Sequence, residues 1–499
     1  MKSFLKTSSL ALLTDLYELT MSYGYWKEGL QDKETVFHLF FRRPPFGGGF
    51  TIAAGLEELV HYLENFHFDS SDISYLETLV GSDGTPLFER KFLEYLLQMT
   101  FTCDVDAVPE GTVVFPHEPL LRIQGSIIQC QILESAILNH INFASLIATK
   151  SARICLAAKG DEVLEFGLRR AQGMDGAMTA SRSAFIGGCS GTSNALAGKI
   201  YGIPVKGTHA HSWVMIFDDE LESFEAYARS LPNNCVFLVD TYNTLEAVKK
   251  VIKVGKKLKE SGKKLLGIRL DSGDLAYLSV ECRKLLDEAG FHDTAIVASN
   301  ELDETIISDL KSQGAQISIW GVGTNLVTAR DNPALDGVYK LSAVRDPGGE
   351  WKYKLKLSEQ MVKVSNPGIL QVRRYSMDGE NRADVLYDVP TGLSKTRTII
   401  DPLDATRMKN LPHEMEYEDL LCPIFREGKR VYKLPELGEI REKVQDELAR
   451  FHSGVKRFIN PHQYVVGFDE AFYEMKIDLI KKVRSLNHNS KNEEPGKII

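Results

Sequence analysis

Cysteine is scarce in this chain of 499 residues, and its seven cysteines, at positions 103, 130, 155, 189, 235, 282 and 422, include no Cys-x-x-Cys pair. An odd number of widely spaced thiols builds no disulfide framework and offers no paired zinc ligands. The pattern therefore predicts reduced thiols in a cytoplasmic protein without a zinc site.

Long apolar runs and an excess of positive charge are also missing. No stretch approaches 18 consecutive apolar residues, so the sequence predicts no membrane span. Asp15 and Glu18 interrupt the apolar N-terminal stretch and no small-residue cleavage site follows, so we expect no signal peptide. With 59 basic against 68 acidic residues, the chain lacks the basic footprint of nonspecific nucleic-acid binding.

The composition that remains, 43% apolar and 25% charged, is typical of a globular protein. The length exceeds what one core usually organises, which predicts more than one domain. We expect an N-terminal α/β domain over residues 1–130 and a catalytic domain over 131–345. A C-terminal region over 346–486 is expected to pack back on the N-terminal domain, followed by a disordered polar tail over 487–499.

A pattern of strand, polar loop and helix recurs between about residues 200 and 325. Apolar runs at 235–239, 265–268, 295–298 and 317–320 each lead into a polar or glycine-rich cluster. The pattern predicts parallel strands, in a βα barrel or a doubly wound sheet, which periodicity alone does not distinguish. Because ligands gather at the carboxyl ends of such strands, we expect the polar clusters to form an active site.

Two imidazoles, His209 and His211, follow Gly207 and Thr208 in the segment VKGTHAHSW (205–213). Histidine can bind a metal, attack phosphorus or act as a general base near neutral pH. No further His or Cys at ligand spacing supports a metal pair. One structural and one solvent-exposed histidine is the alternative interpretation.

The loop after residues 265–268 combines a cation, two carboxylates, a hydroxyl and a flexible glycine, namely Arg269, Asp271, Ser272, Gly273 and Asp274. These groups suit a diphosphate, Mg²⁺ and ribose hydroxyls bound together, since Mg²⁺ on phosphates takes only one or two protein carboxylates. The alternative is a simple turn with Asp274 as a helix N-cap, and Asp274 could also do both.

Two other strand ends carry groups suited to anions: Gly321, Gly323 and Thr324 in one, and Phe166, Arg169 and Arg170 in the other. Glycines at a helix start let backbone N–H groups approach a phosphate. Paired guanidinium groups can bind a carboxylate while the neighbouring ring stacks on a flat ligand. An ordinary turn and a solvated charge pair are the alternatives.

Together these residues resemble the nicotinate phosphoribosyltransferase family. The segments that carry the resemblance are TDLYELTM (14–21), FFR (40–42), PFGG (45–48), FASLIATK (143–150), GLRRAQG (167–173), GTHAH (207–211), RLDSGD (269–274) and GVGT (321–324). They occur in order over most of the chain, from about residue 11 to 470.

The resemblance implies an α/β fold of the type II phosphoribosyltransferase kind. That fold has a parallel βα barrel-like domain and an additional α/β domain built from N-terminal and C-terminal segments. It also implies the reaction: nicotinate attacks 5-phosphoribosyl 1-pyrophosphate (PRPP) to give nicotinate mononucleotide and pyrophosphate in NAD biosynthesis, with ATP hydrolysis coupled. Mg²⁺ bound with the substrate phosphates would stabilise the leaving group.

Residue roles follow from the resemblance as well. His211, not His209, would be the transiently phosphorylated histidine, and Arg269 and Asp271 would be catalytic. Tyr17 and Phe166 would sandwich the pyridine ring, with Tyr17 donated by the second subunit of a homodimer whose active site lies at the subunit interface.

The remaining substrate contacts are implied in the same way. Arg169 and Arg269 would lie near the nicotinate carboxylate or the diphosphate, and Asp271 with Ser272 would hold ribose. The 5-phosphate would be bound by Gly321, Gly323 and Thr324, and Thr208 and Gly273 are further substrate-binding residues.

One position bears on the choice of pyridine. Relatives that use nicotinamide carry Asp in a Gly-Thr-Asp stretch, where this chain has Ser193 in GTS (191–193). A carboxylate there would repel nicotinate, so serine favours the acid as substrate.

Rival functions are a nicotinamide or quinolinate phosphoribosyltransferase, and a phosphosugar aldolase or isomerase on a βα barrel. The latter needs a Schiff-base lysine or a carbanion base at a strand end, and no flanking residue activates Lys206, the obvious candidate. A non-catalytic scaffold has no need of so many polar strand ends.

Overall fold

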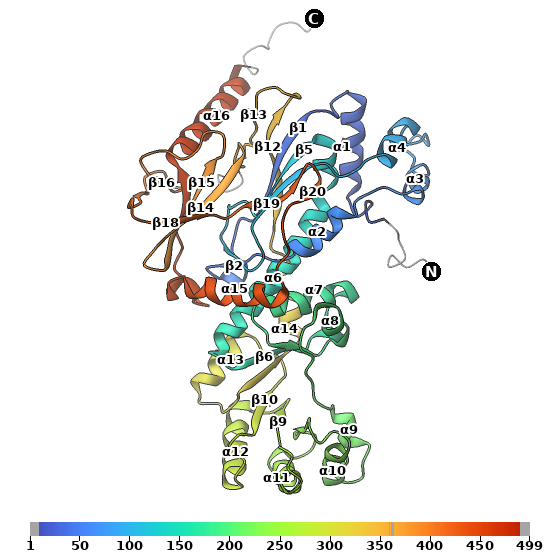
Figure 1. Cartoon of the computed structure of the whole chain (residues 1–499), viewed down its shortest axis with the longest axis vertical. Coiled ribbons are helices and arrows are strands. Elements are labelled where there is room, and N and C mark those ends of the chain that lie inside the picture. Colours follow the sequence, from blue (N-terminus) through green and yellow to red (C-terminus); the bar gives the residue numbers. More distant parts are fainter. Residues whose placement is uncertain (1–8, 359, 361–363, 490–499) are drawn as a thin grey trace, which may run out of the picture. The chain divides into compact units, whose positions relative to one another are not determined.

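The computed structural model describes residues 9–358, 360 and 364–489, which divide between two units (Figure 1). Unit 1 takes in the described chain up to Phe143, then Ala334–Pro435, and the segment from Asp446 onward. Unit 2 comprises Ala144–Pro333 and Glu436–Gln445.

Unit 2 is built on one parallel sheet of six strands in the order β7-β6-β11-β10-β9-β8. The strands are β6 (Glu162–Glu165), β7 (Gly191–Thr192), β8 (Val236–Leu238), β9 (Gly267–Leu270), β10 (Ala295–Ala298) and β11 (Ile319–Val322). The parallel α/β pattern predicted from the sequence is thereby confirmed. In the described chain β7 and β8 are the two edges of the sheet, so closure into a barrel stays a prediction.

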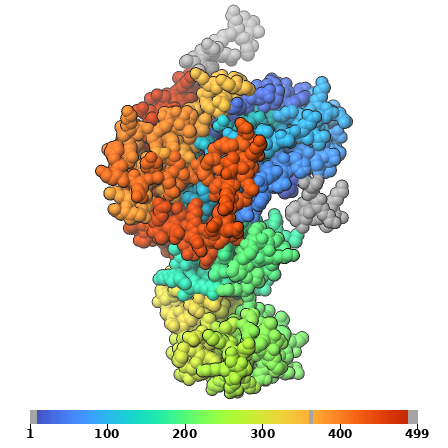
Figure 2. Space-filling view, in the orientation of Figure 1, coloured from blue at the N-terminus to red at the C-terminus, as the bar shows by residue number. Residues whose placement is uncertain are grey.

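Helices alternate with these strands. They are α7 (Gly173–Ile186), α8 (Ala195–Tyr201), α9 (His211–Met215), α10 (Glu220–Ser230), α11 (Thr244–Glu260), α12 (Leu275–Glu288), α13 (Glu304–Ser312) and α14 (Thr324–Val327), with a 3₁₀ turn η3 at Leu168–Arg170. Helix α12 packs on β9 and β10, and α7 packs on β6 and β7. In the space-filling view, the yellow-green segments form the lowest part of the visible surface of this unit (Figure 2).

Polar residues just after the strands start several of these helices. The side chains of Asn243, Asp274 and Asp303 accept hydrogen bonds from backbone N–H groups in the first turns of α11, α12 and α13. Such caps satisfy donors that a helix start leaves unpaired. Asp274 is therefore a helix N-cap, as one of the two interpretations of this loop from the sequence expects.

Unit 1 contains an antiparallel sheet and a mixed sheet made from distant parts of the chain. The largest has the order β13-β12-β1-β5-β3-β19-β20. Its strands are β1 (Glu34–Phe40), β3 (Asp104–Ala107), β5 (Leu121–Ser126), β12 (Val338–Arg345), β13 (Lys352–Tyr353), β19 (Cys422–Arg426) and β20 (Lys429–Arg430). Strand β1 lies between β5 and β12, so segments about 300 residues apart share one ladder.

A second sheet has the order β17-β16-β21-β15-β14-β18, and a short pair joins β2 to β4. The strands are β2 (Thr51–Ile52), β4 (Val113–Val114), β14 (Leu370–Met377), β15 (Glu380–Asp388), β16 (Thr398–Ile400), β17 (Met408–Asn410), β18 (Glu416–Asp419) and β21 (Val466–Asp469).

Helices of the remaining chain are α1 (Leu16–Lys27), α2 (Leu56–Glu64), α3 (Ser70–Leu76), α4 (Arg90–Leu97), α5 (Ile127–Ile132), α6 (Glu134–Ala158), α15 (Leu437–Ala449) and α16 (Glu470–Asn489), with 3₁₀ turns at Pro45–Gly47 and Ser453–Lys456. Helix α16 covers residues 487–489 of the tail expected to be disordered, and 490–499 lie outside the described residues. None of the helices described is long and apolar enough to cross a membrane.

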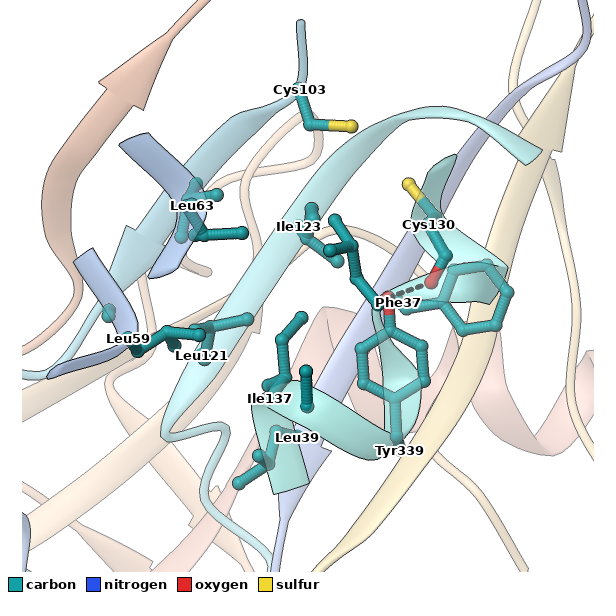
Figure 3. Packing of buried hydrophobic residues seen from close by; sticks show 14 of the residues in the cluster. Phe37, Leu39, Leu59, Leu63, Cys103, Leu121, Ile123, Cys130, Ile137 and Tyr339 are labelled. Atoms are coloured by element: carbon teal, nitrogen blue, oxygen red, sulfur yellow. Dashed lines mark hydrogen bonds between the residues drawn. The ribbon is translucent and has the colours of Figure 1, made fainter. Parts of the chain in front are cut away.

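A large cluster of buried apolar side chains packs on the largest sheet of unit 1 (Figure 3). Phe37 of β1 stacks on Tyr339 of β12 with ring centroids 4.7 Å apart, and the Tyr339 hydroxyl donates to the carbonyl of Cys130 at 2.7 Å. The buried phenol therefore has a partner, as a polar group in an apolar core requires.

Candidate active site

Two adjoining cavities lie at the carboxyl edge of the unit 2 sheet. The first, about 250 Å³, is lined by Phe166, Leu168, Arg169, Ser193, Gly207, Thr208, His209, Ala210 and Arg269. The second, about 140 Å³, is lined by Phe166, Arg169, Arg170, Arg269, Asp271, Ser299, Asn300, Glu301, Gly321, Gly323 and Thr324. Phe166, Arg169 and Arg269 belong to both, so one ligand could occupy the two cavities together.

Arg269, in β9, is the centre of the polar network. Its Nε donates to Ser299 Oγ at 2.8 Å, Nη1 donates to Thr208 Oγ1 at 3.0 Å, and Nη2 donates to Asp271 Oδ1 at 2.6 Å. The guanidinium is thus held by side chains of three loops: the one before α9 (Thr208), the one after β9 (Asp271) and the one after β10 (Ser299). A fixed cation at this edge suits an anionic ligand.

Asp271 is held in its ionised form. Burial by itself would raise the pKa of this carboxyl, but the hydrogen bond from Ser299 Oγ and the charge of Arg269 outweigh burial and hold the pKa below its ordinary value. A carboxylate at this place can stabilise positive charge that develops on a bound sugar.

Asp240, at the end of β8, supports the same loop. Its Oδ2 accepts the Asp271 backbone N–H at 3.0 Å and the Ser272 hydroxyl at 2.5 Å. Its Oδ1 is buried and has no hydrogen-bond partner among the described residues. Ser272 is thereby tied to the site, although it lines neither cavity.

The two histidines occupy different environments. His209 is 8% exposed, and its ring lies 4.8 Å from that of Tyr227. Its Nε2 accepts the Leu238 backbone N–H at 3.2 Å, which leaves the proton on Nδ1, 3.3 Å from the Ala210 carbonyl. Burial lowers the pKa of His209 to about 4, so this imidazole is neutral at physiological pH.

His211 begins α9 and is half-buried. Its Nδ1 lies 3.1 Å from Thr241 Oγ1, and its Nε2 lies 3.8 Å from Asp271 Oδ2. One ring nitrogen is thus engaged by a hydroxyl while the other points to the carboxylate of the network. Of the two histidines, His211 is therefore the one that faces the Asp271 carboxylate.

Gly321 of β11 and Gly323 just after this strand leave room for Phe166. A Cβ added to Gly321 would lie 2.6 Å from Phe166 Cδ2, and one added to Gly323 would lie 3.2 Å from the Phe166 carbonyl. The Arg269 guanidinium lies 5.9 Å from the centroid of the same ring. The ring is confined by these neighbours, and its exposed surface can serve as a stacking wall.

The structure gathers most of the residues singled out in the sequence, but not all. Gly273 lines neither cavity and has φ +80° in the turn before α12. Tyr17 belongs to unit 1, on α1, and is 46% exposed. Lys206 forms an ion pair with Glu162 and lines neither cavity, which disfavours a Schiff-base role.

Sequence reasoning assigned no role to Asp240, Thr241 or Ser299, which bind Asp271, His211 and Arg269. Asp240 and Ser299 directly follow predicted apolar runs and Thr241 is the next residue after Asp240, so their position at a strand end was the available signal. Asn300, next to Ser299, has φ +123°, a conformation that is rare outside glycine and often found at functional sites.

Mg²⁺ on a diphosphate fits the donors at this edge. Among the described residues, no group of three or more His, Cys, Asp or Glu side chains is arranged to hold a metal on protein ligands alone. The unpartnered Oδ1 of Asp240 is the hard oxygen ligand that Mg²⁺ prefers, and one or two such carboxylates suffice when phosphates supply the rest.

A parallel α/β sheet with a cation, an ionised carboxylate and glycine-rich loops at its carboxyl edge defines an enzyme of the class that binds phosphorylated ligands there. Three family models match the chain: the nicotinate phosphoribosyltransferase N-terminal domain over residues 12–142, the nicotinate phosphoribosyltransferase family over 162–348, and the C-terminal domain over 371–476.

Relatives agree along almost the whole chain. A nicotinate phosphoribosyltransferase of Bacillus subtilis is 43% identical over 497 residues, covering 98% of this chain and 99% of its own, and one of Homo sapiens is 34% identical over 518 residues, covering 92% and 94%. The crystal structure of human nicotinic acid phosphoribosyltransferase has a TM-score of 0.81 at 30% identity, over 93% of this chain and 99% of that one. The chain belongs to the nicotinate phosphoribosyltransferase family and is an enzyme of NAD biosynthesis.

Proposed function

We propose that this enzyme transfers the phosphoribosyl group of PRPP to nicotinate, with ATP hydrolysis coupled through a phosphohistidine at His211. The observation that carries the proposal is the Arg269 network, which brings Thr208, Asp271 and Ser299 together beside two adjoining cavities. One cavity has an aromatic wall for a pyridine, and the other has glycines and cations for a phosphosugar.

The pyridine is assigned to the first cavity. Phe166 offers a stacking face there, Arg169 offers a cation for a carboxylate, and Ser193 lines the wall without bringing a negative charge. An aspartate in place of Ser193 would repel nicotinate and accept the amide N–H of nicotinamide. This chemistry supports nicotinate over nicotinamide as the substrate.

The phosphoribosyl group is assigned to the second cavity. Backbone N–H groups at Gly321, Gly323 and Thr324 suit the 5-phosphate, as α14 begins at Thr324. Asp271 would stabilise the oxocarbenium-like ribose as the C1–O bond to pyrophosphate breaks, and Arg269 would stabilise the leaving diphosphate. Mg²⁺ held with the diphosphate at Asp240 and Asp271 would neutralise further charge.

ATP coupling is assigned to His211. In the tautomer whose Nδ1–H donates to Thr241 Oγ1, the Nε2 lone pair is available to attack the γ-phosphorus of ATP with loss of ADP. His209 offers no such nitrogen, because Leu238 N–H occupies its Nε2. The phosphoryl group would add negative charge beside the Arg269 network and help to order the loops there.

We also infer a barrel-like closure of unit 2. Val205 bridges to Thr192 at the β7 edge, and the His209 ring accepts the backbone N–H of Leu238 at the β8 edge. Residues 205–209 thus connect both edges of the sheet. This supports the type II phosphoribosyltransferase architecture.

A homodimer with a shared site is proposed on the exposed apolar side chains of α1 and the segment before it, which include Leu13, Leu16, Tyr17 and Met21. Exposed apolar patches of this kind mark protein interfaces. The family resemblance assigns Tyr17 of one copy to the pyridine cavity of the other. The seven free cysteines fit a reducing cytoplasm.

The decisive experiment incubates the protein with PRPP, Mg²⁺ and ATP, offers nicotinate or nicotinamide, and identifies the products by mass spectrometry. Nicotinate mononucleotide together with ADP is the expected result. Mononucleotide formed only from nicotinamide would overturn the substrate assignment, and turnover that does not respond to ATP would overturn the coupling.

A further inference from the structure

Glu165, the last residue of β6, is a buried carboxylate with three donors directed at it. It is 1% exposed. The backbone N–H of Gly167 donates to Oε1, while the hydroxyls of Ser181 and Thr192 donate to Oε2 at 2.9 and 2.5 Å. The reaction proposed above gives this side chain no task, although it adjoins Phe166.

The two hydroxyls are directed at Glu165 by a second layer of hydrogen bonds. Asn194 donates its backbone N–H to Thr192 Oγ1 at 2.9 Å and its side-chain amide to Ser181 Oγ at 3.2 Å. Because both oxygens already accept from Asn194, their protons are free to point at the carboxylate. Ser181, Thr192 and Asn194 are all buried, so the network is shielded from water.

The network joins two walls of the pyridine cavity. Glu165 is followed by Phe166, and its carboxylate fixes the N–H of Gly167 on the far side of the ring residue. Its own carbonyl accepts the Ser193 backbone N–H at 2.9 Å, and its carboxylate holds Thr192 beside Ser193. Phe166 and Ser193 both line the first cavity.

We propose that Glu165 is a positioning residue that sets the spacing between the stacking ring of Phe166 and the wall at Ser193, and thereby the affinity and selectivity for the pyridine substrate. The inference rests on the proposed assignment of the first cavity to nicotinate. Glu165 does not touch the pyridine, and it acts through the backbone on either side of it.

Glutamine at this position would disturb the spacing without changing the side-chain volume. An amide has one oxygen to accept hydrogen bonds, so it cannot accept from Gly167, Ser181 and Thr192 as two carboxylate oxygens do. Its NH₂ group would face either the Gly167 N–H or the two hydroxyls, so the network loses a hydrogen bond whichever way the amide is turned. The loss releases either Gly167, beyond the Phe166 ring, or Thr192, beside Ser193.

The experiment compares Glu165→Gln with the wild type in the nicotinate and PRPP assay. We expect KM for nicotinate to rise on the order of 10-fold or more, with KM for PRPP nearly unchanged and the preference for nicotinate over nicotinamide reduced. Glu162→Gln, on the same strand but outside both cavities, is the matched control and should leave the three values unchanged.

Ser181→Ala provides a second variant in case Glu165→Gln does not fold, since it removes one donor and little volume. It should raise KM for nicotinate several-fold, again selectively. A wild-type KM for nicotinate in either folded variant, or equal changes in the two KM values, would overturn the positioning role alone. A wild-type protein that forms no mononucleotide from nicotinate would overturn the proposed function, and the positioning role with it.

Discussion

At the scale of single residues, His209 and His211 lie two positions apart in the chain, yet their rings have different surroundings. His209 enters an aromatic cluster and is neutral, with Leu238 N–H on Nε2. His211 starts a helix and faces Asp271. The proposed role of His211 as phosphoryl acceptor can therefore be tested with His209 as the matched control.

His211→Ala should abolish both phosphohistidine and the stimulation of turnover by ATP, because no other ring nitrogen faces Asp271 in the part of the chain that the structure describes. His209→Gln should keep both. The measurement is incorporation of ³²P from γ-labelled ATP with the acid lability of a phosphoramidate. Label retained by His211→Ala would refute the assignment.

The depressed pKa of His209 makes a second prediction, about stability. Its pKa of about 4 in the folded protein lies below the 6.5 of an ordinary histidine, so the unfolded chain binds the extra proton as pH falls through 6.5. The stability linked to this group is therefore present above pH 6.5 and is lost as pH falls towards 4. Between pH 7.5 and 5 the loss should be about 2 kcal/mol.

His209→Gln removes this titration, so its unfolding free energy from urea denaturation should fall less than that of the wild type between the same two pH values. His413→Gln, at an exposed position, is the control and should keep the wild-type difference. An unchanged pH dependence in His209→Gln would show that this imidazole does not carry the linkage.

At the scale of elements, Gly321 of β11 leaves room for the ring of Phe166, which directly follows the neighbouring strand β6. Gly321→Ala would place a Cβ 2.6 Å from Phe166 Cδ2, so the ring must move. We expect KM for nicotinate to rise on the order of 10-fold or more, since small displacements of a substrate wall are costly. Gly438→Ala, in α15 with open space around its Cβ, should leave kinetics unchanged; equal kinetics in both variants would contradict the stacking role.

Sequence patterns predicted elements well where the determining contacts are local. The strand at 295–298 agrees with β10, whereas the run at 265–268 ends two residues before β9 does, because the polar Arg269 and the apolar Leu270 after it also belong to that strand. Short apolar runs therefore indicate where strands lie. The residues at which a strand begins and ends depend on the neighbouring strands with which it pairs, and the run does not reveal these.

Contacts between residues that are distant in the sequence could not be predicted from local patterns. The pairing of β1 with β12 brings Glu34 opposite Arg345, which no local pattern encodes. In the site, the contacts of Asp240 with Ser272 and of Ser299 with Arg269 each join loops about 30 residues apart. The residue types at the strand ends indicated a site, whereas the hydrogen-bond partners of these residues could be identified only from the fold.

At the scale of the whole molecule, the proposed shared site can be tested by mixing subunits. Tyr17→Ala and His211→Ala should each be inactive in the ATP-stimulated reaction. If Tyr17 acts in the site of the second copy, mixed dimers contain one intact site, and an equimolar mixture after subunit exchange should recover about one quarter of the wild-type stimulated activity. No recovery in mixtures that have demonstrably exchanged would place Tyr17 outside a shared site.

The interleaving of the chain between the two units also bears on how the protein is made. A ribosome delivers β6 to β11 in one stretch, so the sheet of unit 2 can assemble while synthesis continues. Strand β1 emerges early but pairs along one edge with β12, which is synthesised about 300 residues later. A strand edge that stays unpaired this long invites aggregation, so we expect the nascent N-terminal segment to need chaperone protection.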